Sequence, residues 1–334
     1  MPALHLLAAI IGCGPLTGET LTIGSDSDAP SVVFGFVEAV RTLKSGRFVV
    51  VLDSRMNRLV VVDCTGRVQS RVGQAGRGPG EFSVPTSLHV GAGDTIHVLD
   101  AATARISRFL LAAPPKYVGG TRLPVGGAVD FCILGDEYVV HTPSAGSLFH
   151  RIARNGDLIG SFGVSPQLAG RTALAATQLT RGVIECSERH AIVLYAASQL
   201  PEVRAFSRAG EELWKNDLAG HRRMSVRITP SQVATSLSDA GSDFVASVVL
   251  LGADDVAVSL GRVYPGGQSR NGFRSVATYI IDLSRGQDLS RHVVQSSQYL
   301  VHVDGDLAFY ARQDPTPHVL IQRAGILLRG RSRR

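Results

Sequence analysis

Three carboxylates are the residues of this sequence whose chemistry a binding or catalytic site could use. Glu38, Asp130 and Glu185 are polar exceptions beside apolar, strand-like runs. Carboxylate oxygens are the ligands that a hard cation such as Ca²⁺ takes, and one carboxylate of such a set can serve as a general base. If the fold brings the three together, their chemistry is that of a calcium-dependent hydrolase or lyase.

Motifs of other common sites are absent from the sequence. It has no G-x-S-x-G, H-E-x-x-H or EF-hand pattern, and no C-x-x-C pair or cysteine–histidine spacing typical of zinc. Gly78-Pro79-Gly80 is not followed by Gly-Lys-Ser/Thr, so we do not expect a phosphate loop. We therefore favour a binding module over an enzyme. Apolar surroundings favour buried thiols, and a disulfide among Cys64, Cys132 and Cys186 stays open.

Composition and charge limit the class of protein. The chain has 334 residues, of which 44% are hydrophobic and 19% charged, which excludes a disordered or collagen-like protein. The net charge is +6, but four arginines lie in the last six residues, so the remainder carries only +2. We interpret 329–334 as a basic tail. Without a basic patch, nucleic acid is not an expected partner.

The first thirteen residues point to export. Residues 4–12 are almost all apolar and end directly at Cys13, which suits the apolar core of a secretory signal. Ile10-Ile11-Gly12-Cys13 resembles the bacterial lipobox, although no Lys or Arg stands before it. The resemblance implies a signal segment over 1–13, lipidation of Cys13, a tether over 14–30 and attachment to the cell envelope. The alternative is an ordinary buried first strand.

An internal repeat organises the rest of the chain. Leu43–Asp53 and Val90–Asp100 both consist of a strand end, a glycine turn, a strand and an aspartate, and weaker copies follow. The units are about 48 residues long, and each contains four short strands separated by turns. Such a repeat predicts an all-β, six-bladed β-propeller with four antiparallel strands per blade. We place it at 31–328, with a closing strand from 19–24 and partly helical segments at 169–180 and 230–240.

The stretch from Gly73 to Ile106 resembles a known family. Its sequence, with Gly78-Pro79-Gly80-Glu81-Phe82 followed by a strand, Asp100 and Arg105-Ile106, is similar to the NHL-repeat propellers. The similarity is strong in the first two blades and weak beyond them. Propellers of similar fold include calcium-dependent lactonases and lyases. The resemblance therefore keeps a metal enzyme open, with Glu38, Asp130 and Glu185 facing the channel.

Loop lengths predict which face of the propeller is functional. Turns between the first and second strands are short, whereas the links between blades and the turns between the second and third strands are longer and share the opposite face. Variable loops on a rigid scaffold commonly carry function. The candidate binding residues on this long-loop face are Asp53, Arg55, Asn57, Asp100, His141, Tyr195, Arg262, Tyr264, Arg270, Asn271, Arg312 and Asp314.

These candidates have structural alternatives. Asp53 and Asp100 end strands before turns and could cap turn amides, whereas His141 and Tyr195 replace the repeated aspartate. Altogether, the sequence predicts an exported, lipid-anchored monomer that binds a protein, peptide or glycan and needs no cofactor. It meets the membrane through its lipid only. The alternative is a calcium-dependent hydrolase or lyase with its site at the channel mouth.

Overall fold

The structure is a computed structural model. The residues that it describes are 20–24, 32–43, 46–111, 115–144, 146–164, 173–200, 202–229, 233–265 and 273–324. Statements about contacts below refer to these residues. Cys13, Arg270 and Asn271 lie outside them, as does the basic tail at 329–334.

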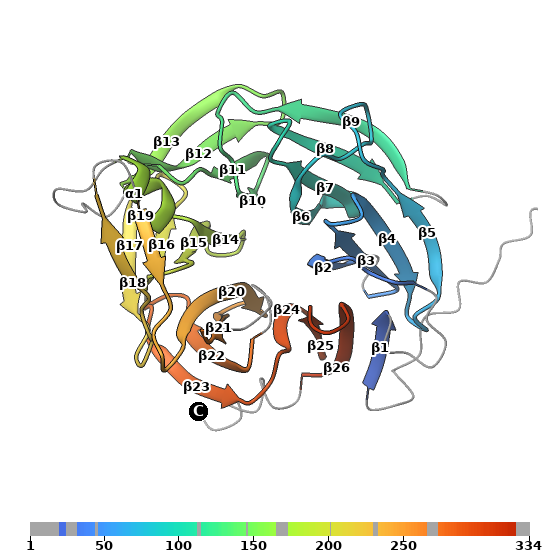
Figure 1. The fold of residues 1–334 in the computed structure, drawn as a ribbon. Helices are drawn as coiled ribbons and strands as arrows, with labels where there is room; N and C mark the ends of the chain where they lie inside the picture. The colour runs from blue at the N-terminus through green and yellow to red at the C-terminus, as the bar shows by residue number, and fades with distance from the viewer. Residues whose placement is uncertain are drawn as a thin grey trace, which may run out of the picture.

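Six four-stranded antiparallel sheets stand around a central axis like the blades of a propeller (Figure 1). The predicted all-β, six-bladed architecture with four antiparallel strands per blade is confirmed. In each blade the first strand is innermost, and the following strands lie progressively further out. The channel is consequently lined by one strand from each blade.

The first three blades are continuous in sequence. Blade 1 comprises β2 (Val37–Leu43), β3 (Phe48–Asp53), β4 (Arg58–Asp63) and β5 (Val68–Val72). Blade 2 comprises β6 (Pro85–Gly91), β7 (Thr95–Asp100), β8 (Arg105–Leu110) and β9 (Lys116–Arg122), with the short η1 (Ala92–Asp94) in its first turn. Blade 3 comprises β10 (Asp130–Leu134), β11 (Glu137–His141), β12 (Ser147–Ala153) and β13 (Leu158–Val164).

The ring continues through three further blades. Blade 4 comprises β14 (Gly182–Ser187), β15 (Ile192–Ala197), β16 (Glu202–Ser207) and β17 (Glu212–Asp217). Blade 5 comprises β20 (Ser242–Leu251), β21 (Asp255–Val263), β22 (Ser275–Asp282) and β23 (Asp288–Val294). Blade 6 comprises β24 (Tyr299–Asp304), β25 (Leu307–Arg312), β26 (His318–Arg323) and β1 (Thr20–Gly24).

Strand β1 joins the two ends of the described chain. It pairs antiparallel with β26, from Thr20 opposite Gln322 to Gly24 opposite His318. An N-terminal strand therefore forms the outer edge of the last blade, which closes the ring by hydrogen bonds between segments about 300 residues apart in sequence.

The core is divided among the junctions between blades. The described residues form six buried apolar clusters, one at each junction. Strand β3 shows how the sequence achieves this, because Val49 and Val51 pack toward blade 6 whereas Val50 and Leu52 pack toward blade 2. Successive side chains of a strand point to opposite faces. A strand buried on both faces is therefore apolar throughout.

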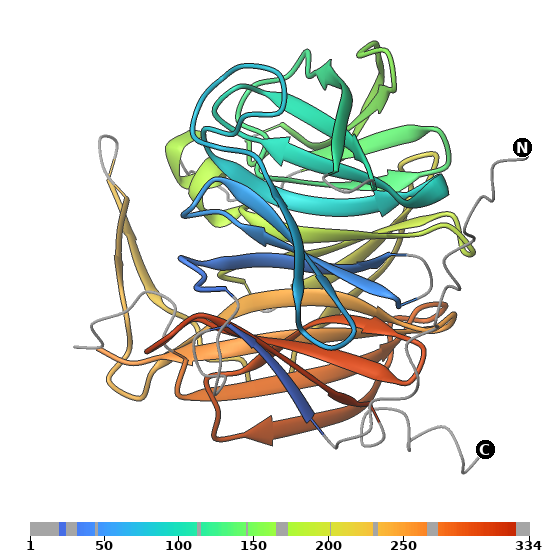
Figure 2. The ribbon, with the colours of Figure 1, turned by 90° about the vertical axis from the view of Figure 1, so that its right-hand side faces the viewer.

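The two predicted helical segments have different outcomes. The first contains α1 (Ala173–Leu179), a short helix in the link between blades 3 and 4. The second prediction is wrong, because Val233–Ser236 is strand β19, paired with β18 (Ser225–Ile228). Tertiary pairing and the β-branched residues of this hairpin outweigh the weak helical pattern. The hairpin projects from one face of the ring (Figure 2). Among the described residues no helix has the length and apolar character needed to cross a bilayer.

Candidate functional site

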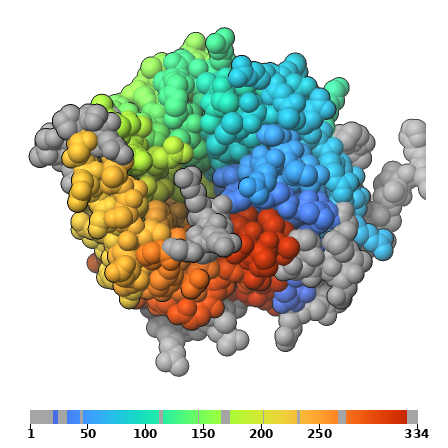
Figure 3. Space-filling model, viewed as in Figure 1, coloured from blue at the N-terminus to red at the C-terminus, as the bar shows by residue number. Residues whose placement is uncertain are grey.

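The long-loop face is the side of the ring that carries the hairpin β18–β19, and it faces the viewer in Figure 3. The innermost strand of each blade begins at this face, so its first residues lie at the mouth of the channel. Glu38 and Asp130 lie near or at the start of β2 and β10. Arg41 and His89 lie deeper, in the second halves of β2 and β6.

A cavity of about 220 Å³ occupies the channel. Its lining is mostly polar and includes Glu38, Arg41, His89, Asp130, Glu185 and Ser247. The three carboxylates singled out in the sequence therefore do line one cavity. Within the described residues, however, no group of three or more His, Cys, Asp or Glu side chains is arranged to hold a metal ion.

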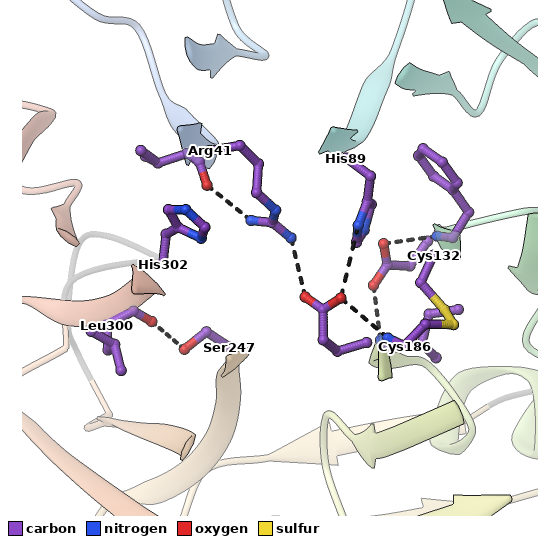
Figure 4. A network of polar contacts seen from close by, with 12 residues as sticks. Arg41, His89, Cys132, Cys186, Ser247, Leu300 and His302 are labelled. Carbon is purple, nitrogen blue, oxygen red and sulfur yellow. Dashed lines mark hydrogen bonds and ion pairs between the residues drawn. A yellow bond between two sulfur atoms is a disulfide. The ribbon is translucent and has the colours of Figure 1, made fainter. Parts of the chain in front are cut away.

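The deep end of the cavity is crossed by charged side chains (Figure 4). Arg41 Nη2 of blade 1 lies 3.3 Å from Glu185 Oε2 of blade 4, and His89 Nδ1 of blade 2 lies 3.9 Å from Glu185 Oε1. Burial and the neighbouring Arg41 hold the pKa of His89 well below its usual range, so this imidazole is neutral. The attraction across the channel is thus between Arg41 and Glu185.

The innermost strands of blades 3 and 4 are joined covalently beside this cavity. Cys132 of β10 and Cys186 of β14 form a disulfide, with their Cα atoms 5.6 Å apart. Cys186 directly follows Glu185 and its backbone N–H donates to Glu185 Oε1 at 3.1 Å. The disulfide therefore fixes the strand that presents Glu185. It also corrects the expectation that Cys132 is a buried thiol.

The carboxyl groups of the cavity are harder to ionise than free ones. Burial raises the pKa of Glu38 to about 7, against a hydrogen bond from Ser54 that lowers it. Burial raises the pKa of Asp130 to about 6, although Asp130 accepts backbone N–H groups of Phe131 at 2.8 Å and Ile184 at 2.9 Å. Burial also raises the pKa of Glu185, and Arg41 opposes that rise.

An open groove of about 980 Å³ lies on the long-loop face beside the channel mouth. Its walls are the segments 34–36 and 83–86, the turn 54–57 and the link 313–317. Three of the predicted binding residues line it, namely Arg55, Asn57 and Asp314. Glu38 lines both the groove and the channel cavity, so the two spaces meet at this residue.

The carboxylates of Asp53 and Asp100 support two walls of the groove through hydrogen bonds. Asp53 is fully buried and accepts the backbone N–H groups of Gly35 and Phe36 at 3.0 and 3.1 Å. Asp100 is also fully buried and accepts the N–H groups of Ser83 and Val84 at 2.6 and 3.3 Å. Both side chains hold the links that form groove walls, which is the capping role that the sequence left open.

The other candidates on this face are mostly engaged within the protein. His141 and Tyr195 are buried, with His141 Nδ1 3.0 Å from the Leu148 carbonyl and the Tyr195 hydroxyl donating to Thr180. Tyr195 lies two residues before the end of β15, so it does not occupy the strand-end position of Asp53.

The arginines of this face have internal partners as well. Arg262 makes two hydrogen bonds to Asp243, at 2.7 and 3.0 Å, and Tyr264 lies beside Arg274. Arg312 donates to the Asp314 carbonyl at 2.7 Å. Arg262 and Arg312 are thus held separately, and neither lines the groove.

Comparison with known proteins identifies the architecture. Residues 30–146 match the sequence profile of the family DUF5128, described as a 6-bladed beta-propeller. Sequence match and structure agree on this fold. No curated protein matches the chain.

Solved structures show the same fold at low identity. A member of the DUF4221 family from Bacteroides vulgatus has a TM-score of 0.61 at 8% identity, covering 92% of this chain and 96% of that one. A predicted exported protein of Bacteroides fragilis has a TM-score of 0.55 at 13% identity, covering 91% and 94%. Virginiamycin B lyase from Staphylococcus aureus has 0.51 at 9%, covering 90% and 98%. Likeness at these identities establishes the fold alone.

Several residues of the site are missing from the sequence-based set. Arg41 has a recoverable signal, because it is a second charged residue in the first strand of blade 1, three positions after Glu38. The exposed apolar residues at the rim of the groove carry no such sequence signal. Val84 lines the groove and is 50% exposed, and Val33 and Met56, which adjoin lining residues in sequence, are 60% and 51% exposed, but all three resemble core residues in sequence. Only their position in the links reveals them.

Proposed function

We propose that this chain is an exported, lipid-anchored, monomeric β-propeller of the NHL type, which binds an extended peptide segment of a partner protein at the cell envelope. The binding site is the groove between blades 6, 1 and 2, and the single observation that carries the proposal is the exposed apolar rim of this groove.

The groove has the composition of a peptide site. The exposed side chain of Val84 lines the groove, and the exposed Val33 and Met56 are the sequence neighbours of its lining residues Phe34, Arg55 and Asn57. Polar groups such as Arg55 and Asn57 line its walls. Apolar contact area with a few placed polar groups is the usual make-up of a ligand site. The aromatic rings of the groove lining are Phe34 and Phe36, with no tryptophan or tyrosine, and Phe34 is buried. Little aromatic surface is therefore free for a glycan to stack on, which favours a peptide.

Two features support export. Disulfides persist mainly in oxidising compartments, and Cys132 and Cys186 form one. The apolar segment ending at Cys13 resembles a lipoprotein signal. The NHL assignment has support from Asp53 and Asp100, which hold the inter-blade links in equivalent ways.

A metal-dependent hydrolase or lyase is the alternative. Glu38, Asp130 and Glu185 share one cavity, but Glu185 is paired with Arg41 and Asp130 with backbone amides. We do not propose this activity. A calcium titration that raises the melting temperature in proportion to ligand concentration would favour it over the binding module.

Selection from a displayed peptide library tests the binding site. Peptides enriched on the wild-type protein are assayed against Val84→Arg, which places a long cation on the groove rim, and against Val293→Arg, an equally exposed position on the outer strand of blade 5. We expect Val84→Arg to weaken binding at least tenfold and Val293→Arg to leave it unchanged. Equal binding by both variants would show that the groove is not the site.

Metabolic labelling tests the anchor. In a bacterial host supplied with a clickable fatty acid, the full chain should incorporate label and Cys13→Ala should not. Unlabelled protein that retains residues 1–12 would contradict lipidation. Peptide binding at the groove would remain to be judged by the selection experiment.

A further inference from the structure

We propose that the channel cavity receives the positively charged end of the bound ligand, with Glu38 pairing with an ammonium or guanidinium group. The inference rests on the proposed function and deepens it. A peptide in the groove would insert one lysine or arginine side chain through the channel mouth. Glu38 would then determine specificity for basic side chains.

Glu38 lies where the groove and the channel cavity meet. Glu38 and Thr86 line both the groove and the channel cavity, so they stand where a side chain would pass from one to the other. The groove is open to solvent and flanked by the apolar rim of Met56 and Val84. A backbone bound in the groove would therefore have Glu38 among its lining residues.

The Glu38 carboxylate has a neutral hydrogen-bond partner, the hydroxyl of Ser54. Its Oε2 accepts one hydrogen bond, from the Ser54 hydroxyl at 2.8 Å. Within the described part of the chain it forms no ion pair with a Lys, Arg or His, and no backbone N–H donates to it. A neutral hydroxyl does not neutralise a carboxylate.

Other carboxylates of this protein set the standard for comparison. Those that are buried among the described residues have a cation or backbone N–H groups as partners: Asp53 with Arg58, Asp100 with four N–H groups, Glu137 with Arg151 and Arg208, Glu202 with Lys215, and Asp243 with Arg262. Buried charges are normally paired in this way. At Glu38 the protein leaves the position of the cation open.

The charges around Glu38 favour a cation over an anion. Burial raises the pKa of Glu38 to about 7, against the lowering by the Ser54 hydrogen bond, and Asp130 adds to the rise as a like charge. Arg41 is already committed to Glu185, and His89 and His302 are neutral because burial lowers the pKa of both. Arg181 lines the cavity as well, but it is exposed to solvent. A ligand cation at Glu38 would offset the repulsion from Asp130.

The shape of the cavity selects a long, narrow group. Its volume is about 220 Å³, and since a water occupies about 30 Å³ of the liquid, it accommodates several waters or one extended side chain. Arg41 and Glu185 line it as well, and their ion pair crosses the channel. The walls include the hydroxyls of Ser87 and Ser247, which can contact the polar end of such a group.

The first test uses n-butylammonium as the probe and n-butanol as its uncharged control. Side-chain carboxyl groups of glutamate are labelled with ¹³C and followed by NMR while each probe is added. We expect n-butylammonium to lower the apparent pKa of Glu38 and n-butanol to leave it unchanged. In Glu38→Gln, binding of n-butylammonium should weaken at least tenfold, whereas the exposed Glu211→Gln should bind as wild type.

Controls for folding keep this test interpretable. Ser54→Ala removes the hydroxyl but keeps the charge of Glu38, so it should still bind n-butylammonium and should not bind n-butanol more tightly. Unchanged binding of n-butylammonium by a folded Glu38→Gln protein, or no effect of the probe on Glu38 of the wild type, would overturn the inference.

A second test separates this inference from the proposed function. Each lysine or arginine of a selected peptide is replaced by norleucine, which keeps an aliphatic side chain without the charge. Loss of at least tenfold in affinity at one position, abolished in Glu38→Gln, is expected. Peptides that depend on Val84 but tolerate norleucine everywhere would refute the role of Glu38 and leave the groove standing. Binding of n-butylammonium by a protein that enriches no peptide would refute the peptide groove and leave the role of Glu38 standing.

Discussion

Arg41 and Glu185 meet across the axis of the propeller, with Nη2 and Oε2 3.3 Å apart. They come from the innermost strands of blades 1 and 4, which are opposite each other in a ring of six. The pair therefore joins two blades that share no junction. Both residues line the channel cavity.

Removing one partner of this pair should destabilise the protein. Arg41→Met leaves Glu185 without its cation in a cavity where only about 15% of that side chain is exposed. We expect a loss of about 1–3 kcal/mol in the free energy of unfolding, below the full cost for a completely buried pair. Urea denaturation measures it. The exposed pair of Arg189 and Asp254 is the control, and Arg189→Met should change stability by less than about 0.5 kcal/mol.

Asp100 should contribute to both stability and binding. It accepts four backbone N–H groups, those of Ser83, Val84, Ala102 and Thr103. Asp100→Ala leaves these donors unsatisfied and frees the groove wall, so we expect a loss of about 2–4 kcal/mol and weaker peptide binding. Asp217→Ala, at a position with a 72% exposed side chain, should be neutral in both assays. A neutral Asp100→Ala would show that the wall is held by other contacts.

The disulfide should stabilise the ring of innermost strands. Cys132 and Cys186 are 54 positions apart, and cross-links that close loops of this length contribute about 2–4 kcal/mol, mainly through the unfolded state. The double substitution Cys132→Ser and Cys186→Ser should lower the denaturation midpoint, and the wild type under reducing conditions should match it. An unchanged midpoint would mean that packing at this junction already suffices.

The pH dependence of stability should report the burial of Glu38. Its pKa of about 7 lies above the ordinary value of 4.5, so the folded state binds the proton more tightly than the unfolded state. Stability from this group is complete below about pH 4.5 and is lost as pH rises through 7. Glu38→Gln should therefore equal the wild type near pH 4.5 and exceed it above pH 7, by up to about 3 kcal/mol.

Buried histidines give stability the opposite dependence on pH. This contribution cancels when the wild type is compared with Glu38→Gln. Burial lowers the pKa of His97 and His302 to about 3, so both proteins lose stability as pH falls below 6.5 because the unfolded chain binds protons first. The difference between the wild type and Glu38→Gln isolates the carboxyl. A difference that does not vary from pH 5 to 8 would contradict the raised pKa.

The sequence predicts the fold well because its signals are local. Strands such as Phe48–Asp53, their glycine turns and their 47-residue recurrence follow from neighbouring residues. The second strand of blade 1 is apolar from Phe48 to Leu52 because it is buried on both faces. The hairpin at Val233–Ser236 is the exception, since its pairing with Ser225–Ile228 outweighs its local propensity.

The site is less predictable because it depends on pairing across the ring. Sequence places Glu38, Asp130 and Glu185 on the channel, but it cannot show that Arg41 neutralises only Glu185. It also offers Asp53 as a binding residue, whereas its fully buried carboxylate holds Gly35 and Phe36. Which carboxylate remains unpaired is decided by three-dimensional contacts.

Photo-crosslinking through methionine tests the central claim most directly. The chain has three methionines, Met1, Met56 and Met224; Met56 stands on the groove rim with half its surface exposed, and Met224 precedes the projecting hairpin. With photo-methionine incorporated and the partner crosslinked in the cell envelope, mass spectrometry identifies the attachment point. We expect crosslinks at Met56 that are lost with Val84→Arg. Crosslinks confined to Met224 would contradict it.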